Sequence, residues 1–209
     1  MKTFKLTLAA LTLFAAFTFS SCKEETPVVV EEVVAVEDGL SGEFAINTDA
    51  STLSWLGKKV TGEHSGSIKI QEGSFTIDKN VLTSGNILMD MTTISVGDLT
   101  DAEKNAQLIE HLNSEDFFNT ALFPTAAFVI NKTDNASVAG DLTIKGITNR
   151  VKFGYTLTES ETEITVEGTL IVDRTLYDIK YGSGKFFEKL GDKAINDEFE
   201  LKFKMVSTK

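Results

Sequence analysis

Apolar and polar residues alternate along most of the chain after about residue 66, with a period of two. In the C-terminal segment, for example, Glu200, Lys202 and Lys204 separate the apolar residues from Phe199 to Met205. The same spacing recurs at Ile68 and Ile70, Phe75 and Ile77, Ile87, Met89 and Met91, Phe128 and Ile130, Leu142 and Ile144, Val151 and Phe153, Ile164 and Val166, and Leu170 and Val172. Because successive side chains of a strand point to opposite faces of its sheet, this pattern predicts about eight half-buried β-strands.

One segment departs from this period and predicts helical structure. Thr100 and Glu103 form a capping-box pattern, in which the threonine caps the first turn and the glutamate reaches back to it. The helix that follows would place Ala102, Ala106, Ile109 and Leu112 on one stripe. A second short helix can begin at 114–116 and present Phe117 and Phe118. We expect these two short helices to plug or flank the sheet.

The strands and the helical insertion fit a single domain. Residues 43–209 are 167 in number, which is enough for a substantial core. About eight strands with hairpin-length links favour an all-β antiparallel barrel, because closure removes exposed strand edges. A two-sheet β-sandwich is the alternative, since alternation alone does not separate the two architectures.

The first 21 residues have the pattern of an export signal peptide. Lys2 and Lys5 precede an apolar run over residues 6–19, and Ser20 and Ser21 then lead to a cysteine. The run is shorter than the roughly 20 apolar residues that a membrane-spanning helix needs. We therefore expect residues 1–21 to be removed.

Cys22 is the only cysteine in the chain, so an intramolecular disulfide is excluded. The small residues before it resemble a lipoprotein cleavage site, which implies an acylated Cys22 at the mature N-terminus. Residues 22–42 alternate valine and glutamate blocks and predict a flexible acidic tether. The expected location is the cell envelope, as an outer-membrane lipoprotein. Lys23 with its two following acids leaves both the periplasmic and the surface-facing side open.

Charge excludes several classes of partner. The formal net charge is −11, and removal of residues 1–21, which hold two lysines and no acids, changes it to −13. Nucleic-acid binding normally requires an excess of lysine and arginine, and docking on anionic lipid requires a basic patch. We therefore expect no nucleic-acid partner, and expect membrane attachment through acyl chains.

Motifs for catalysis or metal binding are not found. The expected mature domain has no Gly-x-Ser-x-Gly elbow, and its two histidines, His64 and His111, lie 47 positions apart without the tight spacing of a zinc site. No local pattern singles out a carboxylate pair among the 31 acids. The prediction is a protein that is not an enzyme and has neither a metal nor a cofactor.

Several phrases along the chain resemble a known family. They are Trp55-Leu-Gly-Lys-Lys, Gly62-Glu-His-Ser-Gly66, His111-Leu112 through Phe117-Phe118 to Phe123-Pro124, Gly140-Asp-Leu-Thr-Ile-Lys-Gly146, and Val172-Asp-Arg-Thr-Leu-Tyr177 running into Tyr181-Gly182. Together they resemble the YceI-like family of polyisoprenoid- and lipid-binding proteins over residues 43–207. The resemblance implies an eight-stranded, elongated lipocalin-like barrel that carries a lipid and performs no catalysis.

A barrel of eight strands is either filled by its own side chains or wide enough for one small ligand. Phenylalanine and methionine line such a cavity without requiring hydrogen bonds, which suits a long aliphatic chain. The predicted lumen residues are Phe75, Met89, Met91, Phe117, Phe118, Phe128, Phe153 and Phe203. The same alternation also fits an ordinary packed core, so that reading stays open.

For a lipid head group, the candidates are His64, Arg174 and Tyr177, followed by Lys58 and His111. A guanidinium can bind a phosphate through two hydrogen bonds, so Arg174 would suit a pyrophosphate-bearing lipid. Each candidate also has a purely structural interpretation. For Arg174, which the pattern places on a strand, that interpretation is a salt bridge to the neighbouring Asp173 or to another acid.

Two functions therefore remain. The first is a carrier that holds an isoprenoid or similar amphiphilic lipid in its lumen. The second is a surface interaction lipoprotein with a packed barrel, for which the segment from Gly182 to Phe187 is the candidate patch. That segment is equally a candidate for the flexible lip through which a lipid enters. A homodimer is a further expectation, and the size of the internal cavity separates the two functions.

Overall fold

The computed structural model describes residues 39–134 and 136–209. The predicted signal peptide, the acylated Cys22 and most of the tether lie outside these residues. The strands are β1 (Gly42–Ala45), β2 (Thr52–Lys59), β3 (Gly62–Asp78), β4 (Val81–Val96), β5 (Thr125–Thr133), β6 (Ser137–Ile144), β7 (Ile147–Glu159), β8 (Glu163–Asp173) and β9 (Ile195–Thr208). The helices are α1 (Ala102–Asn113) and the 3₁₀ turns η1 (Arg174–Tyr177) and η2 (Gly191–Lys193).

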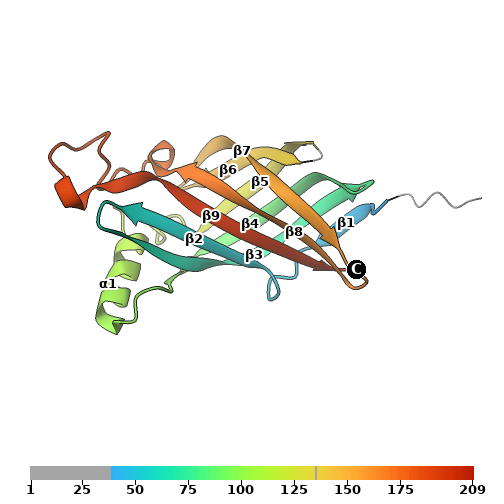
Figure 1. The fold of residues 1–209 in the computed structure, drawn as a ribbon, viewed down its shortest axis with the longest axis horizontal. Helices are drawn as coiled ribbons and strands as arrows, with labels where there is room; N and C mark the ends of the chain where they lie inside the picture. Colours follow the sequence, from blue (N-terminus) through green and yellow to red (C-terminus); the bar gives the residue numbers. More distant parts are fainter. Residues whose placement is uncertain (1–38, 135) are drawn as a thin grey trace, which may run out of the picture. The chain divides into compact units, whose positions relative to one another are not determined.

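Strands β2 to β9 form a closed antiparallel barrel (Figure 1). Each pairs with its neighbour in the chain, and the pairing of β2 with β9 closes the circle. The long strand β3 pairs with β2 through Gly62–Ser67 and with the short β1 through Ser74–Ile77. Strand β2 therefore lies beside the first part of β3, and β1 lies beside its last part. The predicted eight-stranded barrel is confirmed, and the sandwich alternative is wrong because no edge of the barrel is left open.

The predicted alternation places the core inside this barrel. In β9, Leu201 and Met205 are buried while Lys202 and Lys204 are exposed. In β6, Val138, Leu142 and Ile144 are all buried, as are Ile164, Val166, Leu170 and Val172 of β8. The period of two therefore divides the residues between an apolar lumen and a polar outer surface, as a barrel of this size requires.

Helix α1 differs in detail from its prediction. Asp101, not Thr100, is the N-cap, and its Oδ1 accepts from the amides of Glu103 and Lys104, both at 3.1 Å. The buried stripe is also displaced. Leu112 is buried, with Leu108 and Ile109 packed against the core, whereas Ala102 and Ala106 are exposed.

A second helix does not form after α1. Residues 115–118 instead make hydrogen-bonded turns, in which the amide of Phe117 donates to Ser114 and the amide of Phe118 donates back to Leu112. These turns present Phe117 and Phe118 to the core, as predicted. No helix within the described residues has the length and apolar character needed to cross a membrane.

The connections divide between the two ends of the barrel. One end, which we call the mouth, carries the β2–β3 turn, α1 and the segment after it, the β6–β7 turn, and the β8–β9 connection with η1 and η2. Figure 1 shows α1 and the β8–β9 connection at this end and the C-terminus at the other. Strand β1 begins beside the end of β3, away from the mouth.

Candidate ligand site in the barrel lumen

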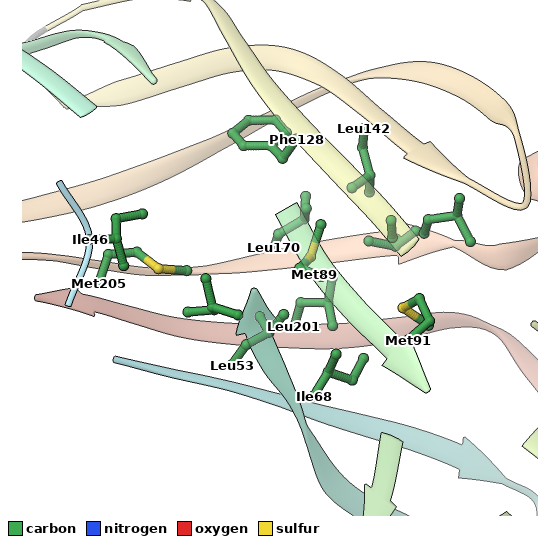
Figure 2. Close-up of a cluster of buried hydrophobic side chains, with 14 of the residues drawn as sticks. Ile46, Leu53, Ile68, Met89, Met91, Phe128, Leu142, Leu170, Leu201 and Met205 are labelled. Atoms are coloured by element: carbon green, nitrogen blue, oxygen red, sulfur yellow. The ribbon is translucent and has the colours of Figure 1, made fainter. Parts of the chain in front are cut away.

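Two cavities lie along the lumen. The outer cavity, of about 90 Å³, is nearer the mouth, and the inner cavity, of about 70 Å³, lies deeper. Their walls share Leu53, Met89, Leu142 and Leu201, and we call this set of four residues the waist. In Figure 2, Leu53, Leu201 and Met89 lie between Met91, on the outer cavity, and Met205, on the inner cavity. The waist therefore divides one lumen into two compartments.

The outer cavity is bounded by barrel strands and by the segment around α1. Phe117 and Phe118 reach it from the turns after the helix, and Leu112 reaches it from the last turn of α1 itself. Met91 contributes from β4. The insertion thus covers part of the barrel interior near the mouth, as the sequence predicted.

Aromatic rings from alternate strands of the barrel, β3, β5, β7 and β9, line the inner cavity. Phe128 and Phe153 have ring centroids 5.4 Å apart, and Phe153 meets Phe203 at 5.4 Å in an edge-on arrangement. Phe75 and Tyr155 also belong to the aromatic lining. Such contacts fix the rings relative to one another without any hydrogen bond, so the wall is smooth and apolar.

All eight predicted lumen residues therefore lie on the wall of one cavity or the other. Their contact with a ligand stays a prediction. Sequence reasoning did not single out Leu53, Leu142 and Leu201 of the waist, although Leu142 and Leu201 share the alternation of the predicted strands. It also did not assign Trp55 to the lumen.

Trp55 lines the outer cavity and is the only tryptophan of the chain. Its Nε1 donates to the carbonyl of Ser95 at 3.1 Å. Gly66 makes this close packing feasible, because a Cβ at that position would lie 1.7 Å from the Ser95 oxygen. Trp55 of β2 and Gly66 of β3 therefore face each other in the wall of the site, and the glycine leaves room for the Trp55 ring and the Ser95 carbonyl.

An irregularity in the pairing of β2 with β9 lies beside the outer cavity. Gly57 pairs with Phe199 and Lys59 pairs with Ile195, so residues 196–198 stand opposite the single residue Lys58. This is a bulge, which locally interrupts the ladder of hydrogen bonds. Lys58, Asn196 and Glu198 are exposed and also belong to the lining of the outer cavity, so this lining extends to the surface there. We call these three residues the portal.

Arg174 supports the portal from inside. Its side chain is 3 % exposed and donates three hydrogen bonds: Nε to Asn196 O at 2.9 Å, Nη1 to Ile179 O at 2.8 Å and Nη2 to Ile195 O at 3.1 Å. Two of these carbonyls belong to the bulged stretch of β9, where the regular ladder is interrupted. Arg174 therefore satisfies polar backbone groups that the bulge leaves unpaired.

This geometry changes the interpretation of Arg174. The residue begins η1 and does not lie on a strand as predicted. Its ionic partner is Asp197, at 3.8 Å, while Asp173 instead pairs with Lys185 at 2.9 Å. Burial lowers the pKa of Arg174, against the opposing charges of Asp197 and Asp173. Because three of its five N–H groups are engaged by the backbone, a phosphate clamp is disfavoured and a structural role is favoured.

Tyr177 is also buried, but away from the cavities. Its side chain is 1 % exposed, lines neither cavity, and its hydroxyl has no hydrogen-bond partner. Burial raises the pKa of Tyr177 to about 12, and the nearby amide of Asn149, which donates to the carbonyl of Leu176 and makes no hydrogen bond of normal geometry with the hydroxyl, opposes this only in part. The structure does not bring this hydroxyl to the portal.

His64 lies on the first residues of β3, outside both cavity walls. Its Nδ1 is 2.8 Å from Oδ2 of Asp98, whose Oδ1 accepts from the amide of Ser65. Burial would raise the pKa of Asp98, but the hydrogen bonds from Ser65 and His64 together lower it. The histidine thus links β3 to the segment that leads into α1.

Of the two weaker candidates, only Lys58 reaches the site, as part of the portal. His111 instead packs edge-on against Phe117 and Tyr181, with ring centroids 4.9 and 4.6 Å away. Its Nε2 is 3.3 Å from a carboxylate oxygen of Asp116. Within the described residues, no three His, Cys, Asp or Glu side chains gather in a way that could hold a metal ion.

Fold and site together define a small closed β-barrel with an apolar lumen open near one end. The family model of the YceI-like domain matches residues 44–207, so the chain belongs to the YceI-like family. Protein YceI of Escherichia coli O17:K52:H18 is 34 % identical over 90 residues, which cover 41 % of this chain and 44 % of that protein. The chain thus spans less than half the length of this relative.

Two solved structures share the fold. BcnA of Burkholderia cenocepacia superposes with a TM-score of 0.65 at 22 % identity, covering 78 % of this chain and 99 % of that one. A polyisoprenoid binding domain from Saccharophagus degradans, implicated in plant cell wall breakdown, superposes with a TM-score of 0.58 at 14 % identity, covering 79 % and 97 %. At these identities the likeness concerns the barrel architecture.

Proposed function

We propose that this protein binds the apolar chain of an isoprenoid or similar amphiphilic lipid in its lumen and carries or sequesters it in the cell envelope. The observation that carries the proposal is the pair of apolar cavities placed in line and opened at the portal. Membership of the YceI-like family and the similarity in fold to a polyisoprenoid binding domain support the choice of ligand. Binding, without making or breaking a bond, is the whole of the proposed activity.

The geometry gives the ligand an orientation. Polar side chains border the lumen at the portal, through Lys58, Asn196 and Glu198, while the inner cavity is lined by apolar and aromatic groups. A head group would therefore stay at the portal, and the tail would pass the waist toward Phe128 and Phe153. Each buried methylene contributes about 0.8 kcal/mol, so the tail supplies most of the affinity.

The waist must move to admit a long chain. The cavities have volumes of only about 90 and 70 Å³, and the side chains of the waist stand between them. Met89 is suited to this movement, because its unbranched side chain has three rotatable bonds. The small volumes equally favour the alternative function, a packed barrel that acts through its surface, so the decisive test is ligand uptake.

Location is part of the proposal. The predicted signal peptide and the acylated Cys22 would attach the domain to the outer membrane, facing either the periplasm or the surface. The acidic composition, with 31 acids against 20 basic residues, supports attachment by acyl chains and not by a basic patch.

The experiment is native mass spectrometry of the protein purified with its own export signal, followed by extraction of any bound lipid and by titration with geranylgeraniol. Trp55 reports uptake by its fluorescence, because its ring lines the outer cavity. Uptake should fail in Phe153→Asp and Met89→Asp, which place a charge in the lumen. Val129→Asp, on the exposed face of β5, is the matched control. An empty wild-type protein that takes up no added lipid would establish the packed-barrel alternative.

A further inference from the structure

Most of the exposed large apolar side chains lie at the mouth. Of the nine in the described residues, seven lie at this end, six in its connections and Ile147 at the start of β7, and we call them the mouth rim: Val60, Leu122, Ile147, Leu176, Tyr181, Phe186 and Phe187. The other two, Val129 and Ile171, lie on the outer faces of β5 and β8. An exposed apolar set gathered at one end of a domain marks an interaction surface.

Direct contacts join the segments of the mouth rim into one surface. Lys145, in the β6–β7 turn, donates to the carbonyls of Glu115 and Asp178, at 3.4 and 3.3 Å. Tyr181 meets His111 of α1, and the amide of Val60 donates to Ala194 at 3.2 Å. The segment after α1, the β6–β7 turn, the β8–β9 connection and the β2–β3 turn are thereby held together.

The most prominent part of the rim is an ordered turn. Phe186 and Phe187 are 49 and 50 % exposed, and both their amides donate to the carbonyl of Ser183, at 3.1 and 3.0 Å. Ser183 itself is fully buried. Two phenyl rings are therefore presented to solvent by a turn that is fixed to the core, which lowers the entropic cost of using them for binding.

Charge around this turn differs from that of the whole chain. Residues 174–198 hold five basic and five acidic side chains, whereas the β4–β5 connection at the same end, residues 97–124, holds six acids and one lysine, and the chain has a net charge of −11. Lys180 lies 5.2 Å from the ring centroid of Phe186. A segment that is neutral, aromatic and flanked by lysines suits the headgroup layer of a neutral phospholipid bilayer, where aromatic residues insert and long basic side chains reach back to water.

The portal adds the second reason for a bilayer. Asn196 and Glu198 follow directly on the β8–β9 connection, and Lys58 is next to the β2–β3 turn that carries Val60. We propose that the mouth rim docks on the surface of a neutral phospholipid bilayer and places the portal against the lipid phase. The purpose of this docking, loading the lumen without passage of the tail through water, rests on the proposed function.

The test uses the expected mature chain, residues 22–209, with Cys22→Ser, so that neither acyl chains nor the apolar run of residues 6–19 contributes. Glu188→Cys, next to the exposed rings, carries an environment-sensitive nitrobenzoxadiazole dye, and Val129→Cys carries the same dye on the barrel wall as a matched control. With phosphatidylcholine vesicles, the dye at position 188 should brighten and shift to the blue while the dye at 129 stays unchanged. Adding Phe186→Ser and Phe187→Ser should weaken this response ~10-fold or more, because two partly exposed rings no longer insert.

Each of the following results would overturn the proposal: no change at position 188, equal changes at 188 and 129, or a response that depends on protein concentration without vesicles. The last would identify a second copy of the chain as the occupant. A requirement for phosphatidylglycerol would also contradict a neutral bilayer. Geranylgeraniol binding, followed by Trp55 fluorescence without vesicles, separates failure of docking from failure of the proposed function. A variant that does not dock can still bind the lipid in its lumen.

Discussion

At the scale of single residues, Arg174 shows how a candidate for ligand binding turns out to hold the wall of the site. Arg174→Lys removes the planar group that reaches the carbonyls of Ile179, Ile195 and Asn196. We expect the free energy of unfolding to fall by about 2 to 4 kcal/mol, because buried carbonyls lose charged donors. Urea denaturation measures the loss. Arg150→Lys is the control, since Arg150 is exposed beside Asp141 and should change stability by less than about 0.5 kcal/mol.

Tyr177 provides a test that depends on pH. Its folded pKa of about 12 lies above the ordinary value of 10.0, so the folded state holds the proton more tightly than the unfolded chain. The resulting stability is fully present below pH 10 and is lost as the pH rises toward 12. Tyr177→Phe should abolish this part of the alkaline loss and should cost about 1 kcal/mol or less at neutral pH, because the hydroxyl has no partner.

Denaturation of both proteins at a series of alkaline pH values checks this expectation. Tyr181→Phe is the control, because Tyr181 is exposed and its replacement should leave the alkaline loss intact. Equal pH profiles for wild type and Tyr177→Phe would contradict a buried, protonated tyrosine.

At the scale of elements, the start of α1 has two neighbouring residues that could each cap the helix, Thr100 and Asp101. Asp101→Ala should cost about 1 kcal/mol, since Asp101 accepts from the amides of Glu103 and Lys104. Thr100→Ala should cost no more than a few tenths of a kcal/mol, because the cap is one residue further along. Thermal unfolding of the two variants compares them directly, and a larger loss for Thr100→Ala would restore the capping box that the sequence suggested.

The same elements show what a sequence can predict. Alternation over β3 to β9 predicts the strands and places Phe75, Phe128 and Phe153 inside, because the pleat leaves only two faces. It does not predict the bulge at residues 196–198, since a register shift depends on how two distant strands meet. The portal and the role of Arg174 both follow from that bulge, so neither was visible in the chain alone.

At the scale of the whole molecule, the waist makes binding depend on the length of the ligand. Met89→Trp enlarges a side chain that both cavities share and should close the passage between them. A short chain such as geraniol, which can lie in the outer cavity, should bind nearly as before, whereas geranylgeraniol should lose ~10-fold or more of its affinity because its tail no longer reaches the inner cavity.

Competition of each lipid against a fluorescent fatty-acid probe measures the two affinities, and it avoids the second tryptophan that the variant introduces. Overpacking of the waist should also cost about 1 to 3 kcal/mol of stability, so denaturation must first show that the variant is folded. Val129→Trp, on the outer face of β5, should bind both lipids as wild type does. If Met89→Trp weakened both lipids equally, the lumen would act as one compartment, and the waist would have no part in selecting the chain.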